Sequence, residues 1–280
     1  MPLTGKILIT GGTGTLGQSL TRRILKEDVE SIRIYSRNEY AQVLMQSEML
    51  DSRLRFFIGD VRDRDRLYRA MNGVDYVIHC AALKHVPVCE YNPLEAVKTN
   101  IIGSMNIIDS AIDAKVKKVI NISSDKAVHP INIYGATKLA SEKLFINSNV
   151  YGNGETVFSC IRFGNFINSR GSVAELWAKQ RMKGEPITLT DKEMSRFWID
   201  IDEASEFVLK TLERMEGGEI YVPLMPKKKM EDLLKELAPE SQVKVIGRRD
   251  GEKKHEELVS EGEEFTREDD CLKIKCWSAE

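Results

Sequence analysis

The chain has 280 residues, and its 41 lysines and arginines nearly balance its 43 aspartates and glutamates, which leaves a formal net charge of −2. Hydrophobic residues make up 42% and charged residues 30%, the balance of a globular protein with a core of its own. This composition argues against a disordered or fibrous chain, and the near-zero charge lacks the basic excess of a nucleic-acid binder.

The apolar runs and the cysteines predict a cytoplasmic protein. No run of about 18 apolar residues is present, so we expect no membrane partner, and the N-terminal residues enter a strand pattern without the apolar stretch of a signal peptide. The five cysteines form no Cys-x-x-Cys pair, which fits a reducing compartment, and the four histidines lack metal-ligand spacing. We therefore expect no metal and no nucleic-acid partner.

Apolar segments alternate with helical patterns through the first 165 residues. A helix is expected over residues 16–27 and another from Asn92-Pro93, a favourable helix start, to about residue 113. Strands are expected at residues 6–10, 32–36, 54–60, 76–82, 119–124 and 157–163. Short apolar runs separated by helices indicate a parallel sheet covered on both faces, and right-handed crossovers make it doubly wound. We predict an α/β fold of the Rossmann type.

The pattern changes after residue 165. Helices are expected over residues 173–183, 201–214 and 230–237, with short strands at 219–222 and 243–246. No Pro/Gly/Ser-rich linker separates the two parts, so residues 166–280 are predicted to form a small α/β domain built directly onto the sheet of residues 1–165 and partly interleaved with it. The charged stretch 252–270 is expected to be a solvated surface.

Residues 10–17, with the sequence TGGTGTLG, lie between the first expected strand and the first expected helix. Glycines there let the chain turn sharply, let the backbone approach a pyrophosphate and let the helix pack closely on the strand. The helix N-terminus presents N–H groups to the anion. A plain tight turn is the alternative, but the strand–loop–helix order favours dinucleotide binding. The candidate residues are Gly11, Thr13, Gly14, Thr15, Leu16 and Gly17.

The tip of the second strand favours NADP over NAD. Ser36, Arg37 and Asn38 stand there, where a bare adenosine ribose usually meets an acidic residue. A hydroxyl and a guanidinium suit a 2′-phosphate instead. The alternative is an ordinary exposed arginine.

The tips of the next two strands offer further cofactor contacts. Asp60 and Val61 follow the third strand and are candidates for the adenine edge. Ala81 and Ala82 follow the fourth strand and are small enough for a cofactor to press against the backbone. We expect all four residues to line the dinucleotide site.

Tyr134 and Lys138 are four residues apart in a helical pattern, so they share one helix face. A nearby ammonium lowers the pKa of a phenol, and a phenolate can take the proton of a sugar hydroxyl as its carbon is oxidised. Surface Tyr/Lys pairs at this spacing are common. This pair, however, begins a helix shortly after Ser124, at the edge where parallel sheets keep their ligands. Together with the glycine loop it resembles the extended short-chain dehydrogenases/reductases.

Asp125 and Lys126 directly follow Ser124 and add a second acid–base pair. Dehydration needs such a pair: a base for the proton beside a new ketone, and an acid for the leaving hydroxyl. We expect partial burial and cationic neighbours to lower the pKa of Lys126 enough for it to be the base. A surface salt bridge that caps the strand is the alternative.

These residues resemble one subgroup, the soluble C5-inverting UDP-N-acetylglucosamine 4,6-dehydratases. ALKHVP, SDKA and YGATK are the most specific matches. Many relatives have Thr in place of Ser124 and Pro in place of Asp250, and typical members extend several tens of residues further. The matching stretches are residues 10–17, 35–39, 56–63, 81–103, 123–145, 162–173, 194–199, 217–223 and 251–257.

The resemblance implies a role for each catalytic residue. Tyr134 and Lys138, with Ser124, would oxidise C4 of the sugar by passing hydride to NADP. Lys126 would remove the C5 proton, and Asp125 would help to expel the C6 hydroxyl as water. Hydride would return to C6, and reprotonation of C5 from the opposite face would invert that centre, so that NADP is recycled within each turnover.

The resemblance also implies residues that bind cofactor and substrate. Lys84, Thr99 and Asn100 match positions near the nicotinamide and the sugar. Asn100 would otherwise be a polar packing group; Arg249 and Glu252 would otherwise belong to the charged tail, and Arg196 to the surface. The implied substrate contacts are Lys84, His85, Asn165, Arg196, Arg249 and Glu252. Relatives form dimer-based higher oligomers, so a homo-oligomer is expected, either a dimer or a dimer-based hexamer.

Three competing functions remain at this point. A retaining 4,6-dehydratase differs only in the face from which C5 is reprotonated, which the residues do not show. A UDP-sugar 4-epimerase is disfavoured because Asp125 and Lys126 would have no task in it. A non-catalytic NADP-binding regulatory protein is expected to have lost Tyr134, Lys138 or Lys126, and this chain retains all three.

Overall fold

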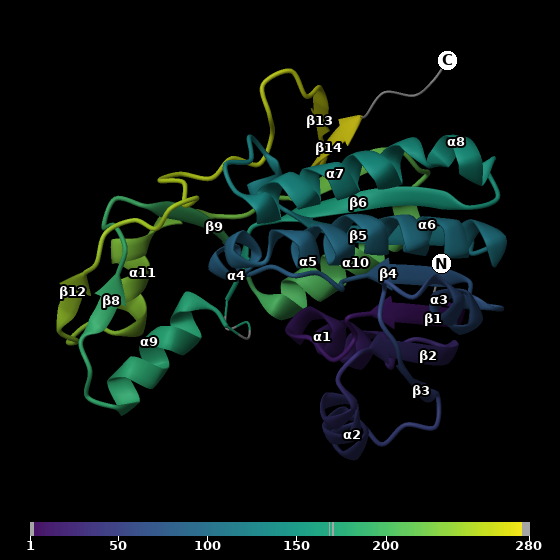
Figure 1. The fold of residues 1–280 in the computed structure, drawn as a ribbon, viewed down its shortest axis with the longest axis horizontal. Helices are drawn as coiled ribbons and strands as arrows, with labels where there is room; N and C mark the ends of the chain where they lie inside the picture. The colour runs from purple at the N-terminus through teal and green to yellow at the C-terminus, as the bar shows by residue number, and fades with distance from the viewer. Residues whose placement is uncertain (1–2, 168, 170, 276–280) are drawn as a thin grey trace.

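A nine-stranded β-sheet forms the centre of the protein in the computed structural model, which describes residues 3–167, 169 and 171–275 (Figure 1). The strand order is β13-β14-β10-β6-β5-β4-β1-β2-β3, and every strand from β3 to β10 in this order runs parallel to its neighbours. β14 and β13 add an antiparallel edge. The order around β1 and β4 is that of a doubly wound sheet, so the predicted Rossmann-type α/β fold is confirmed.

The strands of the central sheet begin and end close to the predicted apolar runs. They are β1 (Gly5–Thr10), β2 (Val29–Ser36), β3 (Leu54–Ile58), β4 (Tyr76–His79), β5 (Lys118–Ser124), β6 (Val157–Phe163), β10 (Glu219–Pro223), β13 (Phe265–Arg267) and β14 (Cys271–Lys275). Ile7, Leu8 and Ile9 of β1 are fully buried, because helices cover both faces of a parallel sheet.

Helices pack on both faces of this sheet. α1 packs against α10, while α3, α6 and α7 lie side by side, α6 and α7 in front of the sheet and α10 behind it in Figure 1. Their bounds are α1 (Thr15–Ile24), α2 (Glu39–Glu48), α3 (Arg64–Met71), α4 (Val86–Tyr91), α5 (Pro93–Val97), α6 (Gly103–Asp113), α7 (Ile133–Asn147), α8 (Asn149–Gly152) and α10 (Ile201–Arg214).

The helix predicted from Asn92 to residue 113 contains an irregularity. A π-helical turn, η1 (Lys98–Ile102), stands between α5 and α6. Asn92 occupies the N-cap position as predicted, but its side chain does not cap the helix; its Nδ2 donates to Val88 O at 3.0 Å instead. The helices α2 and α3 were not predicted. α2 buries only Gln42 and Met45, whereas α3 does bury Leu67, Ala70 and Met71 at helical spacing, a signal that the prediction left out.

A smaller lobe with its own core lies at one end of the sheet, on the left of Figure 1. It contains α9 (Val173–Met182), α11 (Met230–Leu237), β8 (Ile187–Leu189) and β12 (Val243–Val245). Between lobe and sheet stand β7 (Asn165–Phe166), β9 (Ser195–Ile199) and β11 (Lys227–Lys229), which form a three-stranded sheet. Trp177 and Trp198 are almost fully buried in the lobe core.

Residues after 165 contribute to both cores. Trp177 belongs to the lobe, whereas Phe207 of α10, Ile220 of β10 and Ile274 of β14 pack into the core of the large sheet. The second half of the chain is therefore interleaved with the sheet.

The expectation that residues 252–270 are only a solvated surface is wrong. Glu256 is 2% exposed, and Glu263 forms an ion pair with the fully buried Arg162 of β6. Other charged residues of this stretch, such as Glu261 and Glu264, are exposed, but Glu256 and Glu263 meet opposite charges inside the protein, which the local sequence does not reveal.

Four of the five cysteines lie in the described part of the chain, and none of these four forms a disulfide; Cys276 lies outside it. Residues 168 and 170 of the matching stretch 162–173 also lie outside it. No helix among the described residues is long and apolar enough to cross a membrane.

Candidate active site

The glycine loop takes the form that the sequence predicts. Gly11 has a φ of +66°, and its N–H donates to Tyr35 O of β2 at 2.8 Å. A Cβ at Gly11 would lie 2.9 Å from Ala81 N, so the loop touches the backbone after β4. Gly14 is the N-cap of α1, and a Cβ there would meet only Gly11 O, at 3.1 Å. The loop leaves a side-chain-free cradle at a helix N-terminus, which fits a pyrophosphate.

Gly17 fixes the distance between α1 and this loop. A Cβ at Gly17 would lie 2.6 Å from Gly12 Cα and Gly12 O, far inside van der Waals contact. The other candidates of the loop have different surroundings: Thr13 and Leu16 are buried at 7% exposure, and Thr13 O accepts from Gln18 Nε2 at 3.0 Å. Thr15 begins α1.

The three candidates at the tip of β2 have different partners, and one of them, Arg37, lies close to Asp60. The hydroxyl of Ser36 accepts from Gln42 Nε2 at 2.9 Å, and Asn38 caps α2 by accepting from Ala41 N at 3.0 Å. Arg37 is more than half exposed, and its Nη1 lies 3.8 Å from Asp60 Oδ2.

Asp60 stands with its carboxylate already engaged. Arg62 donates to this carboxylate through its backbone N–H and its guanidinium, with Nη2 2.7 Å from Oδ2. Burial raises the pKa of Asp60, but the hydrogen bonds from Arg62 outweigh it, so the pKa lies below its ordinary value. Val61, the other candidate here, is buried beside Gly103. The carboxylate therefore holds Arg62 and faces Arg37.

The loop after β4 is held by Asn100. Its amide accepts from Leu83 N at 2.8 Å and donates to Leu83 O at 2.9 Å and to Thr137 Oγ1 of α7 at 3.0 Å. Ala81 and Ala82 belong to this loop and are half-buried. Asn100 thus joins η1, the loop and the helix that carries Tyr134.

Lys84 and His85 follow in the same loop and are exposed. The ring of His85 lies against Gly171, where a Cβ would approach its Cε1 to 2.5 Å, and burial together with the charge of Lys84 lowers the pKa of His85. Thr99, on η1, is buried, and its hydroxyl has no hydrogen-bond partner among the described residues.

Ser124, Asp125 and Lys126 form a hydrogen-bonded cluster where β5 ends in the 3₁₀ turn η2 (Asp125–Ala127). Ser124 Oγ donates to Asp125 Oδ1 at 3.0 Å, and Lys126 Nζ donates to the same oxygen at 2.9 Å. Asp125 is fully buried, and its other oxygen, Oδ2, has no hydrogen-bond partner in the described part of the chain. A buried carboxylate thus keeps one acceptor available.

The amine of Lys126 is surrounded by oxygens from three segments. Besides Asp125, it donates to Asn165 Oδ1 of β7 at 3.2 Å and lies 3.9 Å from Glu256 Oε1. Burial favours the neutral amine, as the sequence analysis expected, but the charges of Asp125 and Glu256 outweigh burial and raise the pKa of Lys126. The expected low pKa is therefore wrong, because the sequence did not show how many carboxylates face this lysine.

Tyr134 lies in the first turn of α7, close to the Asp125/Lys126 cluster. Burial raises the pKa of its phenol, while the charge of Lys126 and a hydrogen bond with Ser124 oppose the rise only in part. Lys138 was expected to lower this pKa. Its amine instead donates to Ile122 O of β5 at 2.6 Å, and burial lowers its own pKa. The cation that acts on the phenol is Lys126.

Arg196 is not a surface cation. It is 4% exposed, and its guanidinium donates to Lys253 O at 2.9 Å and to Lys254 O at 3.2 Å. Its Nη2 also lies 3.6 Å from Glu252 Oε1, while the other oxygen of Glu252 accepts from the backbone N–H of the exposed Arg249 at 3.3 Å. Arg196 therefore holds the segment that carries Glu252.

The sequence analysis missed Glu256 and Lys253. Lys253 Nζ lies 3.1 Å from Glu256 Oε2 and donates to Val128 O, directly after η2, at 2.5 Å. Both residues lie in the matching stretch 251–257, from which only Glu252 was selected. The residue types offered no further signal, because the stretch looks like any charged surface.

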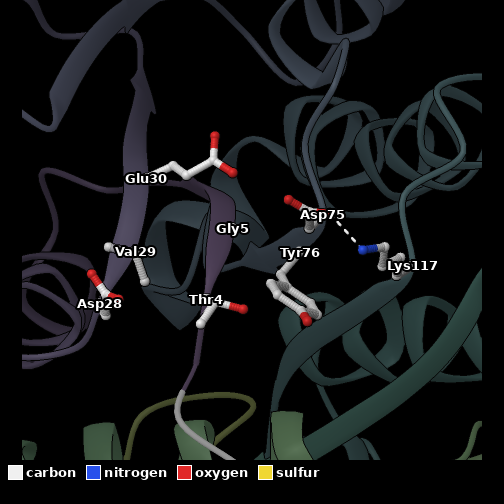
Figure 2. Close-up of a pocket in the computed structure, with 8 residues that line it drawn as sticks. All are labelled: Thr4, Gly5, Asp28, Val29, Glu30, Asp75, Tyr76 and Lys117. Carbon is white, nitrogen blue, oxygen red and sulfur yellow. Dashed lines mark ion pairs between the residues drawn. The ribbon is translucent and has the colours of Figure 1, made fainter.

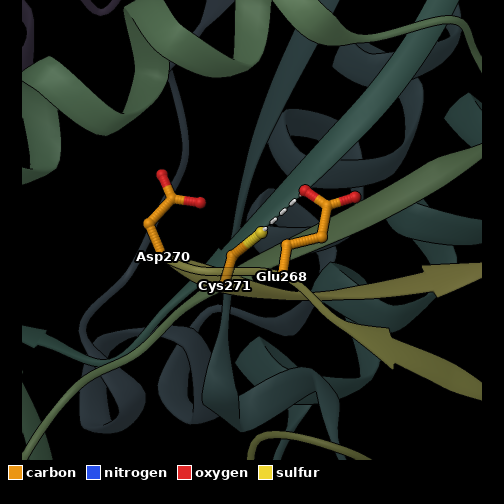
Figure 3. Close-up of side chains that lie close together, drawn as sticks. All are labelled: Glu268, Asp270 and Cys271. Carbon is orange, nitrogen blue, oxygen red and sulfur yellow. Dashed lines mark hydrogen bonds between the residues drawn. The ribbon is translucent and has the colours of Figure 1, made fainter.

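Two other features lie apart from this cluster. A hollow of about 420 Å³ opens at the opposite edge of the sheet, beside Gly5 at the start of β1, and is lined by Asp28, Glu30, Asp75 and Lys117 among others (Figure 2). Near the antiparallel edge, Glu268, Asp270 and Cys271 come together (Figure 3).

We attribute the second feature to an ion-pair cluster rather than to a metal site. Arg214 Nη1 lies 2.7 Å from Asp270 Oδ1 and 3.5 Å from Glu268 Oε2 and so supplies the positive charge. Because an arginine already compensates these carboxylates, the cluster has no need of a cation.

A doubly wound sheet, a glycine-rich first loop and a Ser/Tyr/Lys set at the tip of β5 define a short-chain dehydrogenase/reductase of the extended type. The model of one family, described as polysaccharide biosynthesis protein, matches residues 7–275, and the chain belongs to this family.

A UDP-N-acetylglucosamine 4,6-dehydratase (inverting) from Campylobacter jejuni is 50% identical, over 91% of this chain and 77% of its own. A UDP-glucose 4-epimerase from Rickettsia akari is 42% identical, over 94% of this chain and 80% of its own. The X-ray structure of Pen from Bacillus thuringiensis has a TM-score of 0.92 at 41% identity and covers 96% of this chain and 87% of its own.

Proposed function

We propose that the protein is an NADP-dependent UDP-N-acetylglucosamine 4,6-dehydratase that inverts C5. The observation that carries the proposal is the meeting of Asp125, Lys126 and Tyr134 in one buried cluster at the carboxyl end of β5. The Campylobacter jejuni relative that is 50% identical to this chain is named for the same activity. The product would be a UDP-4-keto-6-deoxy-L-hexosamine.

The residues present fit a nicotinamide dinucleotide. The cradle at Gly11, Gly14 and Gly17, in which added Cβ atoms would meet backbone, suits the pyrophosphate, and Lys138 and Tyr134 would hold the nicotinamide end. The cofactor would supply a hydride acceptor for C4 and a hydride donor for C6. Its remaining contacts would come from Thr13, Thr15, Leu16, Ser36, Arg37, Asn38, Asp60, Val61, Ala81, Ala82, Lys84 and Asn100.

NADP rather than NAD is proposed on the position of Arg37. Its guanidinium is exposed at the tip of β2 and has the forked donors that bind phosphate bidentately. Asp60 lies 3.8 Å away and would be displaced or shared when a 2′-phosphate binds. Binding constants for NADP and NAD, measured for the native protein and Arg37→Ala, test the preference; equal loss for both cofactors would contradict it.

Tyr134 would accept the proton of the C4 hydroxyl while that carbon is oxidised. The adjacent Ser124 hydroxyl and the Lys126 charge stabilise the phenolate form that this step needs. They oppose only part of the effect of burial, which keeps the pKa of the phenol above its ordinary value.

Water elimination needs a neutral Lys126 and a protonated Asp125. At rest the raised pKa keeps Lys126 charged, and the hydrogen bond of 2.9 Å to Asp125 Oδ1 lets one proton move from amine to carboxylate. The pair would then take the C5 proton on Lys126 and deliver a proton to the C6 hydroxyl from Asp125. Oδ1 would carry that proton, while Oδ2, which has no partner among the described residues, would accept a hydrogen bond from the C6 hydroxyl and hold it beside the carboxyl group.

The UDP-sugar would lie over the lobe side of this cluster, near Lys84, His85 and Asn165. Asn165 already contacts Lys126, so it would position the base as well as the sugar. Arg249 is exposed and suits the diphosphate, whereas Arg196 and Glu252 shape the segment from which it projects.

A UDP-sugar 4-epimerase and a retaining 4,6-dehydratase are the alternatives. Epimerisation at C4 leaves no task for a buried Asp125–Lys126 pair, although a 42% identical relative is named as an epimerase. Retention and inversion share the same residues and differ in the configuration of C5.

The test is incubation with UDP-N-acetylglucosamine in D₂O and NMR of the product. We expect deuterium at C5, a methyl group at C6, the L configuration and no net NADPH. A product that keeps its C6 hydroxyl indicates the epimerase, and the D configuration at C5 indicates the retaining enzyme. A small UDP-sugar panel in the same assay tests the substrate.

We further propose that two copies associate through the outer surface of α4, α5, η1 and α6. Five apolar side chains are exposed there: Val88, Tyr91, Leu94, Ile102 and Met105. Large exposed apolar patches mark association surfaces. Light scattering of the native protein and of a Tyr91→Asp/Leu94→Asp variant tests this; a native monomer would contradict it. The cytoplasmic location stays a prediction.

A further inference from the structure

Glu256 is a buried carboxylate to which the reaction as described assigns no task. It is 2% exposed, and its Oε1 lies 3.9 Å from the amine of Lys126. The carboxylate comes from a segment far along the chain from η2. A buried charge of this kind is costly unless it is paired, so its place beside Lys126 requires an explanation.

The segment that carries Glu256 is firmly attached at both ends. On one side, Arg196 donates to the carbonyls of Lys253 and Lys254, and the hydroxyl of Ser195 lies 2.8 Å from His255 Nδ1. On the other side, Arg162 donates to Leu258 O at 2.7 Å. Glu256 is therefore held in place by contacts that do not involve Lys126.

The charge of Glu256 is only partly compensated. Lys253 Nζ lies 3.1 Å from Oε2, yet this oxygen has no well-directed hydrogen bond among the described residues. Asp125 Oδ2 likewise has no hydrogen-bond partner among the described residues. The amine of Lys126 thus lies near two carboxylates, each of which has one oxygen without a hydrogen-bond donor.

We propose that Glu256 is a positioning residue that holds the amine of Lys126 beside Asp125 and keeps it charged until the substrate is bound. The expected effect on dehydration rests on the proposed function. The expected effect on the pKa of Lys126 does not, because it concerns the substrate-free protein. Glu256 touches neither substrate nor cofactor in this account, since it acts through Lys126.

The sign of its effect follows from the charges that face the amine. The carboxylates of Asp125 in η2 and of Glu256, with the phenol of Tyr134 in α7, raise the pKa of Lys126, whereas burial and the charge of Arg196 in β9 oppose them. Lys253 is the other cation of this cluster, and it pairs with Glu256. Removal of the Glu256 charge removes one of the attractive terms, so the amine must lose its proton at lower pH.

The test is competitive acetylation of the substrate-free protein across a range of pH, with the reactivity of Lys126 read by mass spectrometry. Glu256→Gln is expected to lower the pKa of Lys126 by about one unit or more, the effect of an opposite charge within about 4–6 Å. Glu257→Gln is the matched control, because Glu257 is 59% exposed and pairs with His129 instead. An unchanged pKa in a folded Glu256→Gln variant overturns the proposal.

A second variant covers the case in which Glu256→Gln does not fold. Glu256→Asp keeps the charge and withdraws it by one methylene, so a smaller shift in the same direction is expected. No shift in that folded variant equally overturns the proposal.

The catalytic consequence is read from the pH–rate profile of dehydration. In the active state, Asp125 and Lys126 together carry one proton, so activity falls as pH rises through the pKa of Lys126. In Glu256→Gln, this fall in activity at high pH should move to lower pH by the same amount as the pKa of Lys126 measured by acetylation. A shift in acetylation without a shift in the pH–rate profile overturns the role in the reaction. Absence of dehydration by the native protein contradicts the proposed function and leaves the acetylation result to stand alone.

Discussion

Lys126 is the side chain at which the contacts of the candidate site converge. Its amine donates to Asp125 and Asn165, lies near Glu256 and acts on the phenol of Tyr134. Lysine suits this place because its amine is a compact donor whose pKa responds strongly to burial and charge. The same ammonium that stabilises the Tyr134 phenolate becomes the base once it passes its proton to Asp125.

Lys126→Ala is expected to lower the rate of dehydration by about 10²–10⁴-fold, the usual contribution of a general base. Binding of NADP, followed by calorimetry, should persist because the glycine loop is untouched. Lys117→Ala is the control: Lys117 is 66% exposed and pairs with Asp75 at the opposite edge of the sheet. Dehydration by Lys126→Ala at a near-native rate would show that another group is the base.

At the scale of the elements, α1 and β1 place the cofactor cradle through close backbone contacts. Gly17 allows α1 to approach Gly12, and Gly11 allows the loop to touch Ala81 after β4. These contacts are between backbone atoms, so no flexible side chain can move aside when a Cβ is added. The geometry of the cradle therefore requires glycine at both positions.

Gly17→Ala is expected to lower the free energy of unfolding by about 1–3 kcal/mol, the cost of overpacking, and to weaken cofactor binding because the cradle must shift. Denaturant unfolding measures the first effect, and titration with NADP measures the second. Gly152→Ala in α8 is the matched control, since a Cβ there meets its nearest neighbour at 3.5 Å, an ordinary contact. Native affinity in Gly17→Ala would mean that α1 moves without disturbing the cradle.

Thr10 and His79 join β1 to β4 beneath the cradle, with 2.7 Å between Thr10 Oγ1 and His79 Nδ1. Burial and the charge of Lys138 lower the pKa of His79 to about 3. Below about pH 6.5, His79 therefore binds a proton in the unfolded chain but not in the folded protein. This group makes the free energy of unfolding fall as pH falls from about 6.5 towards 3.

The expected slope from His79 is about 1.4 kcal/mol per pH unit within that window. Urea unfolding of the native protein and of His79→Gln at pH 7, 6 and 5 measures it. His79→Gln should be less sensitive to pH by this amount. Equal slopes for the two proteins would show that His79 is protonated in the folded state.

The strands and the glycine loop could be predicted from the sequence because their signals are local. Ile7, Leu8 and Ile9 are buried by the same helices that their continuous apolar run implies. Within the site, Ser124, Asp125, Lys126 and Tyr134 lie close together in the sequence and could be selected from their residue types, whereas Asn165 and Arg196 were expected only through the family resemblance. Glu256 and Glu263 meet partners more than a hundred residues away, and nothing in a charged run tells which charges will be buried.

At the scale of the whole molecule, the C-terminal segment links the lobe, the active-site cluster and the sheet edge. After β12 the chain passes Arg196 and Lys126, then meets Arg162 of β6, and finally joins the sheet as β13 and β14. Arg162 is fully buried and binds Glu142 of α7 at 2.8 Å as well as Glu263 at 2.9 Å. One guanidinium thus connects the catalytic helix to the segment that carries Glu256.

Arg162→Met is expected to lower the free energy of unfolding by about 3–5 kcal/mol, because it leaves two carboxylates buried without a cation. Denaturant unfolding measures it, and Arg64→Met is the control, since Arg64 and its partner Asp113 are about half exposed and such a pair contributes about 1 kcal/mol or less. The triple variant Arg162→Met/Glu142→Gln/Glu263→Gln should recover part of the loss by removing the charges as well.

Because Arg162 also holds Leu258 O, Arg162→Met should in addition lower the pKa of Lys126 by loosening the segment around Glu256. A destabilised Arg162→Met protein with an unchanged pKa of Lys126 would show that the contacts of Ser195 and Arg196 are enough to keep Glu256 in place.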